Sequence, residues 1–545
     1  MIDNKLVQLI ENSITSNWRL PALTNYKAGT CTYKEVADKI LDIHDIFSEL
    51  KIEPDDKIAL LGKNSVNWAI SYLGIVTYGA IVVPILSDFH TKDIAHIIQH
   101  SESVLLFADE NLADELEFDS SDNINAVFSL ENFECIHSCK KKILKKINNL
   151  QKSSKNRNIF SDTFSLPTIS NKELASIAYT SGTTGFSKGV MTTHNNLAAN
   201  LVYAFENMPI ESGDHILSFL PLAHSFGCAF EFLFPFCRGA HITFLNKIPS
   251  PRIILDAFSK VKPKLILTVP LILEKIYNKK IKPKITSQPF KALLKIPGVK
   301  KLIYKKIKDN LVDAFGGEFM EIVIGGAPLN NEVEDFLKKI NFPFTIGYGM
   351  TECAPLISYT GWKNHKKNSV GKPVFTLDVE IDSDDPENEI GEIIVKGENL
   401  FQGYYKDEQT TSKSFENGWF HTGDLGTMDS DNFVFIRGRS KSMILGPSGQ
   451  NIFPEEIEAK INNLPYVQES VVVEREDKLV ALIYPDYEVM DSEGIDESQV
   501  KEIMKENRKK LNQDVPHYSR ITDFELYPEE FEKSPTKKIK RYLYR

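Results

Sequence analysis

The chain has 545 residues, of which 42% are hydrophobic and 25% charged, and this composition excludes a disordered or collagen-like protein. The length exceeds what a single hydrophobic core usually organises, so at least two domains are expected. The formal net charge is −10, which excludes an overall basic footprint for nucleic acid.

The first hundred residues predict helices that alternate with strands. Thr32 stands before an apolar pattern of helical period and is a suitable helix cap. Further along, strands are predicted at Lys57–Leu61, Ile81–Val83 and Val104–Ala108, and helices at Ser65–Tyr78 and Asp93–His100. Because this alternation is typical of βαβ units, we expect a parallel sheet.

The uncharged run from Ser65 to Ser87 is long enough to suggest a membrane span. It contains Gly74, Gly79 and Pro84, however, so a buried helix followed by a buried strand is the better interpretation. The first five residues lack the basic and then apolar form of a signal peptide. The six cysteines are scattered, which fits a reducing compartment, so we expect a cytoplasmic protein.

A segment rich in glycine, serine and threonine runs from Tyr179 to Gly189. The apolar run Leu174–Tyr179 predicts a strand before it, and Thr193 predicts a helix cap after it. Glycine allows backbone N–H groups to approach an anion, hydroxyl groups donate to phosphate oxygens, and Lys188 adds a positive charge. The segment therefore predicts a phosphate-binding turn between a strand and the start of a helix.

This segment differs from a Walker P-loop, because only two residues separate Gly182 from Gly185 and a glycine follows Lys188. It closely resembles the signature of the adenylate-forming superfamily, which includes acyl-CoA synthetases, peptide-synthetase adenylation domains and luciferases. The resemblance implies that ATP is bound, and that its phosphates meet Thr180, Ser181, Gly182, Thr183, Thr184, Gly185 and Lys188.

His224 lies in an apolar segment from Ser218 to Gly227. A histidine in such a segment is usually a core or turn residue. The segment also resembles a motif of the same superfamily, in which the histidine stands beside the acyl pocket and changes position between the two half-reactions. The resemblance implies this catalytic role for His224.

A lysine-rich segment runs from Lys275 to Lys308, with twelve lysines, no acidic residue and interleaved apolar residues. One interpretation is a solvated helical face. The other is a basic amphipathic surface for anionic lipid headgroups, which would place the protein peripherally on the inner face of a membrane. The region from Lys275 to Pro328 resembles the long-chain branch of the acyl-CoA synthetases.

Two apolar runs end in glycine-containing turns, at Ile322–Pro328 and Thr345–Glu352, and both resemble nucleotide-binding edges of the superfamily. An adenine ring needs a thin backbone wall and an aromatic face. Glu352 is an oxygen ligand suited to Mg²⁺ and is predicted as a catalytic and metal-binding residue. The predicted nucleotide contacts are the wall residues Gly326 and Ala327, the aromatic Tyr348, and Gly347, Gly349 and Thr351.

A small β-barrel is predicted from strands at Asp378–Ile381 and Glu392–Lys396. Downstream, Trp419–Asp424 resembles the ribose-binding motif of the superfamily, and an aspartate can accept hydrogen bonds from both vicinal ribose hydroxyls. Arg439 resembles the arginine that contacts ribose or phosphate, and Lys441 falls where the superfamily has its domain hinge.

A smaller α+β domain is predicted after the hinge, with two strands and a helix at Glu469–Val473, Leu479–Tyr484 and Gln499–Leu511. Its last segment, Ser534–Arg541, resembles the motif that carries the catalytic lysine, and the register identifies Lys538 as that lysine. Lys537 stands where the superfamily usually has a glycine, which leaves open whether Lys537 could substitute.

The predicted fold is therefore α/β: a large N-terminal domain, residues 1–440, of two α/β subdomains and a small β-barrel, followed by a mobile α+β domain, residues 441–545. The resemblance implies that a long-chain fatty acid is activated with ATP and Mg²⁺ as acyl-AMP and then transferred to coenzyme A. Two alternatives stay open. One is a ligase that loads a carrier protein or activates another acid, and the other is an inactive scaffold at a membrane.

Overall fold

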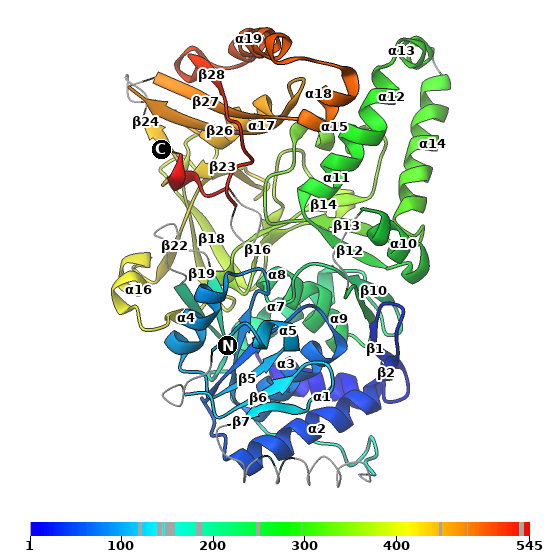
Figure 1. Cartoon of the computed structure of the whole chain (residues 1–545), viewed down its shortest axis with the longest axis vertical. Helices are drawn as coiled ribbons and strands as arrows, with labels where there is room; N and C mark the ends of the chain where they lie inside the picture. The colour runs from blue at the N-terminus through cyan, green and yellow to red at the C-terminus, as the bar shows by residue number, and fades with distance from the viewer. Residues whose placement is uncertain are drawn as a thin grey trace.

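The computed structural model of the chain describes residues 2–117, 123–138, 144, 147, 158–180, 188–246, 251–296, 298–445, 450–476, 478–533 and 539–544. Figure 1 shows a large N-terminal part and, at the top, a smaller C-terminal part coloured orange to red. This arrangement confirms the predicted α/β fold with a large and a smaller domain.

The first sheet contains the strands β3 (Lys57–Leu61), β4 (Ile81–Ile85), β5 (Leu105–Ala108), β6 (Ala126–Ser129), β7 (Cys135–Ser138), β8 (Leu174–Thr180), β9 (Lys188–Thr193) and β20 (Gly403–Tyr404). Their spatial order is β20-β9-β8-β4-β3-β5-β6-β7. The strands β3 to β6 run parallel, which confirms the predicted βαβ units. All side chains of β4 and β5 are buried, which explains their continuous apolar sequence.

Three helices of this region are α2 (Tyr33–Leu50), α3 (Val66–Tyr78) and α4 (Thr91–Ser101). The predicted cap of α2 forms a capping box, in which Thr32 and Glu35 each accept a hydrogen bond from the other's backbone N–H. All residues of helix α3 except Asn67 and Tyr78 are buried, and the helix ends at Gly79, whose φ of +100° favours glycine. In the described part of the chain, no helix combines the length and the apolar character that crossing a bilayer requires.

Two more sheets lie in the N-terminal part, in the orders β10-β11-β1-β2 and β12-β13-β14. Their strands are β1 (Pro21–Asn25), β2 (Thr30–Thr32), β10 (His215–Ser218), β11 (His241–Phe244), β12 (Leu265–Thr268), β13 (Glu321–Ile324) and β14 (Phe344–Ile346). Helix α7 (His194–Asn207) leads from β9 toward β10, and α8 (Ser225–Gly227), a π-helical turn (Cys228–Leu233) and α9 (Phe234–Cys237) lie between β10 and β11. The strands β12, β13 and β14 are parallel, so their carboxyl ends share one edge.

A group of helices separates β12 from β13, and we call residues 270–314 the helical insertion. It consists of α11 (Pro270–Ile276), a π-helical turn (Tyr277–Ile281), α12 (Lys282–Thr286), α13 (Gln288–Leu294) and α14 (Val299–Ala314). In Figure 1 these helices rise at the upper right, with α12 and α14 as the two arms and α13 at the top.

The strands expected in a small β-barrel form a five-stranded antiparallel sheet. They are β18 (Leu377–Asp382), β19 (Gly391–Gly397), β21 (Phe415–Glu416), β22 (Trp419–Met428) and β23 (Val434–Arg439). Side chains of β18 alternate strictly between buried and exposed, which is typical of a sheet covered on one face. A short antiparallel sheet beside it contains β15 (Tyr348–Gly349), β16 (Leu356–Tyr359) and β17 (Lys372–Pro373).

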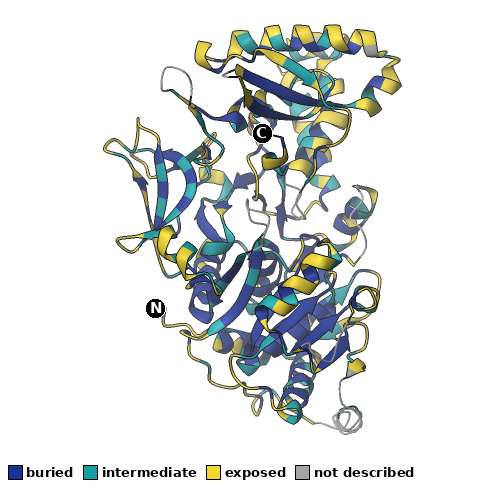
Figure 2. Cartoon of the chain, turned by 60° about the vertical axis from the view of Figure 1, so that its left-hand side comes forward, coloured by how far each residue is buried: buried dark blue, intermediate teal, exposed yellow. Residues whose placement is uncertain are grey.

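The C-terminal part is built on β26 (Val467–Arg475), β27 (Lys478–Pro485) and β28 (Asp523–Leu526), with α17 (Pro454–Ile461), α18 (Tyr487–Glu493) and α19 (Glu497–Asp514). The predicted strand pair and helix are confirmed. Its hydrophobic clusters are separate from those of the N-terminal part. Figure 2 shows dark blue, the colour of buried residues, on central strands of both parts. Polar contacts connect the two parts, among them the ion pair Lys279–Glu488 at 2.9 Å.

Candidate active site

The hairpin of β8 and β9 carries the glycine-rich segment. Thr180 and Lys188 are paired at the end of the hairpin next to the connecting segment. The residues between them, including the predicted contacts Ser181, Gly182, Thr183, Thr184 and Gly185, lie outside the described residues. Backbone N–H groups and hydroxyls of this connection, together with Lys188, remain the predicted phosphate ligands.

One prediction for this segment is wrong. The glycine-rich connection does not lead directly into a helix, because β9 comes first and α7 begins only at His194. The reason is that the run from Lys188 to Thr193 pairs with β8 along its whole length. The helix cap at Thr193 is confirmed, since its side chain accepts a hydrogen bond from the N–H of Asn196. The start of α7 therefore cannot be the anion site.

Tyr404 connects Lys188 to Glu352. The Lys188 ammonium lies 4.9 Å from the centre of the Tyr404 ring, and the Tyr404 hydroxyl donates to a Glu352 carboxylate oxygen at 2.9 Å. Burial raises the pKa of the Glu352 carboxyl, although the Tyr404 hydrogen bond and the Arg439 charge oppose this shift. A nearby cation stabilises the charged form of a partly buried carboxylate. Glu352 is therefore suited to bind a hard metal ion.

Asp424 joins the second nucleotide turn to the predicted ribose motif. Its side chain is buried, it accepts a hydrogen bond from the Tyr348 hydroxyl at 2.7 Å, and it pairs with the Arg439 guanidinium at 3.0 Å. Arg439 is 53% exposed, so its outer nitrogens stay accessible. Three predicted residues from separate strands are thus brought together.

The glycine turns have tight and open positions. A Cβ at Gly349 would overlap the Pro355 carbonyl oxygen, so this position excludes larger residues, and a Cβ at Gly325 would come within 3.1 Å of the Phe226 ring, so Gly325 and Phe226 lie in close contact. Gly326 adopts a φ of +85°, which favours glycine. Gly326 and Ala327 are exposed at the edge of β13, whereas Gly347 continues from β14 into β15. These backbone edges can form the predicted adenine wall.

His224 precedes the short helix α8 and caps it, because its Nδ1 accepts a hydrogen bond from the N–H of Phe226 at 3.3 Å. Phe226 in turn packs against Gly325 at the end of β13. The segment with His224 therefore lies against the first nucleotide turn. This position is the one expected of a residue beside the reacting groups.

A small cavity of about 30 Å³ adjoins this segment, and its lining includes Tyr72, Ser176, Leu197, Ser225, Cys228 and Thr351. Such a volume accommodates about two water molecules. Because Thr351 lines it, the cavity connects the predicted phosphate contact with the apolar interior around α3 and α7.

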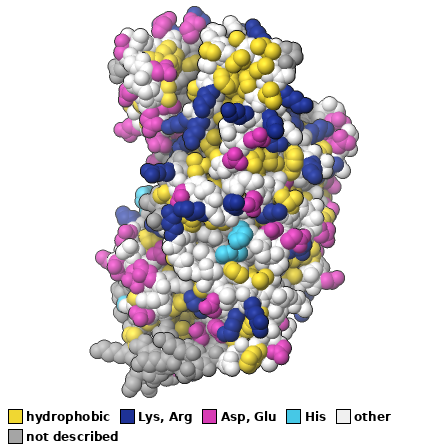
Figure 3. Space-filling model, turned by 90° about the vertical axis from the view of Figure 1, so that its right-hand side faces the viewer, with side chains coloured by type: hydrophobic (Ala, Val, Ile, Leu, Met, Phe, Trp, Pro, Cys, Tyr) yellow, Lys and Arg dark blue, Asp and Glu magenta, His cyan; other side chains and the backbone are white. Residues whose placement is uncertain are grey.

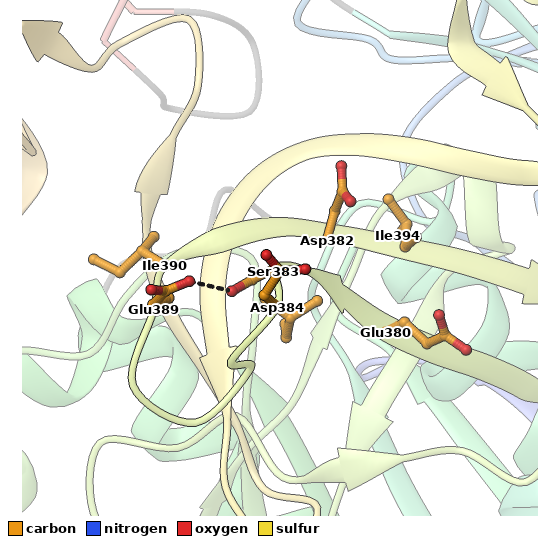
Figure 4. A pocket seen from close by; sticks show the side chains of 8 residues that line it. Glu380, Asp382, Ser383, Asp384, Glu389, Ile390 and Ile394 are labelled. Carbon is orange, nitrogen blue, oxygen red and sulfur yellow. Dashed lines mark hydrogen bonds between the residues drawn. The ribbon is translucent and has the colours of Figure 1, made fainter.

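The larger cavity in Figure 4, about 500 Å³, lies at the β18–β19 hairpin and none of the predicted site residues lines it. Its walls carry the acidic residues Glu380, Asp382, Asp384 and Glu389. Across the described ranges, no group of three or more His, Cys, Asp or Glu side chains is placed to hold a metal ion. Because none of the predicted residues lines the larger cavity and several of them contact Glu352 or Asp424, we centre the candidate site on these two residues.

Lys441 follows β23 in an exposed turn at the start of the C-terminal part. Lys538 lies outside the described residues, but the chain on both sides of it is anchored. Lys533 and Ile539 form a β-bridge, and Lys533 pairs with Glu469 at 2.7 Å. After Ile539, the Arg541 guanidinium pairs with Glu458 of α17.

Two residues were missed by the sequence analysis, Tyr404 and Glu231. Tyr404 belongs to a two-residue strand that no periodicity signals. Glu231 lies in the π-helical turn, fully buried, and its Oε2 accepts hydrogen bonds from the N–H groups of Phe219 and Leu220, both at 2.9 Å. A glutamate within the apolar run Cys228–Leu233 was the available signal. Glu231 therefore fixes the backbone at Phe219 and Leu220, within the segment that contains His224.

Two substitutions of Glu231 distinguish the effect of its hydrogen bonds on folding stability from the effect of its charge. Burial raises the pKa of Glu231 well above its ordinary value of 4.5, so the folded protein binds this proton more tightly than the unfolded chain does. Its contribution to stability is therefore full below about pH 4.5 and declines as pH rises. We expect Glu231→Gln, which stays neutral and keeps an acceptor, to gain stability relative to the native protein as pH rises.

Glu231→Met removes the acceptor and should cost about 2 kcal/mol or more, because two buried N–H groups lose their partner. Thermal unfolding of the three proteins between pH 5 and 8 measures both effects. Equal unfolding temperatures for the Gln and Met variants would contradict this assignment.

The α/β body, the glycine-rich hairpin and the convergence of Glu352, Asp424 and Arg439 define an adenylate-forming enzyme. A family model described as AMP-binding enzyme matches residues 11–405, and the chain belongs to this family.

Relatives agree with this assignment, and a solved structure shares the fold. The chain is 28% identical over 539 residues to the long-chain-fatty-acid–CoA ligase FadD15 of Mycobacterium bovis, covering 90% of this chain and 86% of the relative. It is 27% identical to the chloroplastic long-chain-fatty-acid–[acyl-carrier-protein] ligase AEE15 of Arabidopsis thaliana, covering 87% and 74%. The crystal structure of the anthranilate CoA ligase AuaEII with anthranoyl-AMP shares the fold, with a TM-score of 0.79 at 19% identity, covering 99% and 96%.

Proposed function

We propose that this enzyme activates a long-chain fatty acid with ATP as acyl-AMP, releasing pyrophosphate, and then transfers the acyl group to coenzyme A with release of AMP. The observation that carries the proposal is the convergence of the Lys188–Tyr404–Glu352 contacts with the Tyr348–Asp424–Arg439 cluster beside the glycine-rich hairpin. The long-chain acid and coenzyme A are supported by the relatives named above.

The first step brings a carboxylate to the α-phosphate of ATP. Two unit charges about 4 Å apart repel by about 4 kcal/mol at an effective dielectric constant of about 20. That is about three decades in rate, so positive groups are needed. Lys188 at the hairpin, Lys538 from the C-terminal part and the amides of the glycine-rich connection supply them in this proposal.

Glu352 is the proposed Mg²⁺ ligand. One of its oxygens accepts a hydrogen bond from the Tyr404 hydroxyl, so the carboxylate is fixed in orientation, and burial raises its pKa. These features fit a magnesium ion, which when bound would neutralise phosphate charge. Asp424 holds the ribose hydroxyls, and Arg439 both orients Asp424 and reaches the ribose or phosphate.

The second step requires the thiol to enter where Lys538 stood. We propose that the chain divides into residues 1–440 and 441–545, and that rotation about Lys441 removes Lys538. The separate hydrophobic core of the C-terminal part supports such a motion. His224, whose neighbour Phe226 lies against Gly325, stands at the acyl pocket in this proposal and changes position between the two steps.

A second function differs only in the acceptor or the acid: the enzyme would load a carrier protein, as the name of the Arabidopsis relative says of that protein, or activate another carboxylic acid. ATP–pyrophosphate exchange with a panel of acids, followed by thioester assays with coenzyme A and with a carrier protein, separates these functions. Exchange with no long-chain acid would overturn the proposed substrate.

We further propose a cytoplasmic enzyme that meets its fatty acid at the inner face of a membrane. A long alkyl chain partitions into a membrane, because each CH₂ contributes about 0.8 kcal/mol to transfer out of water. The membrane surface is therefore where the enzyme would meet this substrate.

A further inference from the structure

The helical insertion concentrates positive charge on an otherwise acidic chain. From Lys275 to Lys308 it has twelve lysines and no acidic residue, whereas the whole chain has a net charge of −10. Two of these lysines have acidic partners, Lys279 with Glu488 at 2.9 Å and Lys282 with Glu332 at 2.8 Å. The others whose side chains the structure describes form no ion pair with a described carboxylate.

The unpaired charge surrounds exposed aliphatic side chains at the turn from α13 to α14. Leu293 is 42% exposed, Ile296 48% and Leu302 68%. Lys295, Lys300, Lys301, Lys305 and Lys306 of the same turn and of α14 are also exposed. Figure 3, which faces the side on which the insertion rises, shows yellow hydrophobic side chains next to dark blue Lys and Arg side chains across the upper part of the molecule.

The combination of exposed lysines with exposed aliphatic side chains indicates which kind of partner this surface fits. A merely solvated helical surface has no reason to expose three large aliphatic side chains within ten residues of the chain. Single-stranded nucleic acid is bound by aromatic stacking, but the exposed apolar residues here are aliphatic, and Phe290 and Tyr304 are partly buried. An anionic lipid surface offers phosphate groups to the lysines and acyl chains to the aliphatic residues.

We propose that the turn between α13 and α14 docks the enzyme on an anionic membrane, with Leu293, Ile296 and Leu302 between the headgroups and the neighbouring lysines on the phosphates. The docking proposal depends on the proposed function in one respect only: the function explains why the enzyme would meet its fatty acid at a membrane. The insertion joins β12 to β13, the strand that ends in the Gly325–Gly326 turn, so a docked insertion is connected to the candidate site through one strand.

The test is cosedimentation of the whole protein with vesicles of phosphatidylcholine, alone or mixed with phosphatidylglycerol. We expect binding to the anionic vesicles that weakens with added salt. The triple variant Lys295→Gln, Lys300→Gln, Lys301→Gln should bind about 100-fold more weakly, because each lysine contributes a factor of about five to the affinity. The variant Leu293→Ser, Ile296→Ser, Leu302→Ser should also bind more weakly.

A matched control removes three exposed lysines of α19, with Lys501→Gln, Lys505→Gln and Lys509→Gln, and should bind like the native protein. Equal binding to neutral vesicles, the same loss in the α19 control, or tighter binding to a single-stranded oligonucleotide than to anionic vesicles would overturn the proposal. Ligase activity on detergent-dispersed palmitate is measured in parallel and should not change. An inactive native protein that still binds anionic vesicles would refute the proposed function alone.

Discussion

Replacement of Lys538 by alanine is expected to slow the formation of acyl-AMP by about 10²–10³-fold, the usual cost of one group that stabilises charge in a transition state. The reason is that the carboxylate and the α-phosphate repel each other, and Lys538 is the proposed cation brought by the C-terminal part. The second step, measured by adding acyl-AMP and coenzyme A directly, should keep most of its rate, because Lys538 is proposed to have moved away by then. ATP–pyrophosphate exchange measures the first step.

Lys537→Ala is the matched control, because it removes the same charge one residue away. It should retain the exchange rate within a few-fold. If Lys537→Ala abolished exchange while Lys538→Ala did not, the register would be wrong. If neither variant changed it, the lysine would have no catalytic role.

Glu352→Gln is expected to lower acyl-AMP formation by about 10²-fold or more at ordinary Mg²⁺ concentrations. The amide keeps the size of the side chain and can still accept from Tyr404, but it is a neutral and poorer ligand for a hard cation. The apparent Mg²⁺ requirement should therefore rise in this variant. Burial raises the pKa of Glu352, so replacing it with a neutral amide should not destabilise the fold.

Tyr404→Phe is the companion variant for Glu352. It removes the hydrogen bond that orients Glu352 but leaves the carboxylate, so we expect a smaller loss, of about tenfold. A Glu352→Gln enzyme with native exchange and an unchanged Mg²⁺ requirement would contradict the role assigned to Glu352.

Elements with a strong local signal could be predicted from the sequence. The strand Lys57–Leu61 has the predicted bounds, and the cap at Thr32 forms as expected. The strand Lys188–Thr193 was not predicted, because a hairpin partner, and not local composition, decides whether such a short segment forms a strand. Local sequence does not contain that partner.

The residues of the candidate site also fall into two groups, those that the sequence reveals and those that only the folded chain reveals. Asp424, Arg439 and Glu352 stand out because each belongs to a recognisable motif. The hydrogen bond between Tyr348 and Asp424 joins residues 76 positions apart, and only the folded chain reveals it. Tyr404 and Glu231 were missed for a related reason: their importance comes from the groups they contact, Glu352 and the backbone before His224, and not from their own surroundings in the sequence.

The most direct test of the proposed function is the palmitate-dependent release of AMP and pyrophosphate from ATP and Mg²⁺, measured with and without coenzyme A. We predict sustained release of both products only when palmitate and coenzyme A are present together. Absence of both pyrophosphate exchange and product release with palmitate would contradict the proposed function.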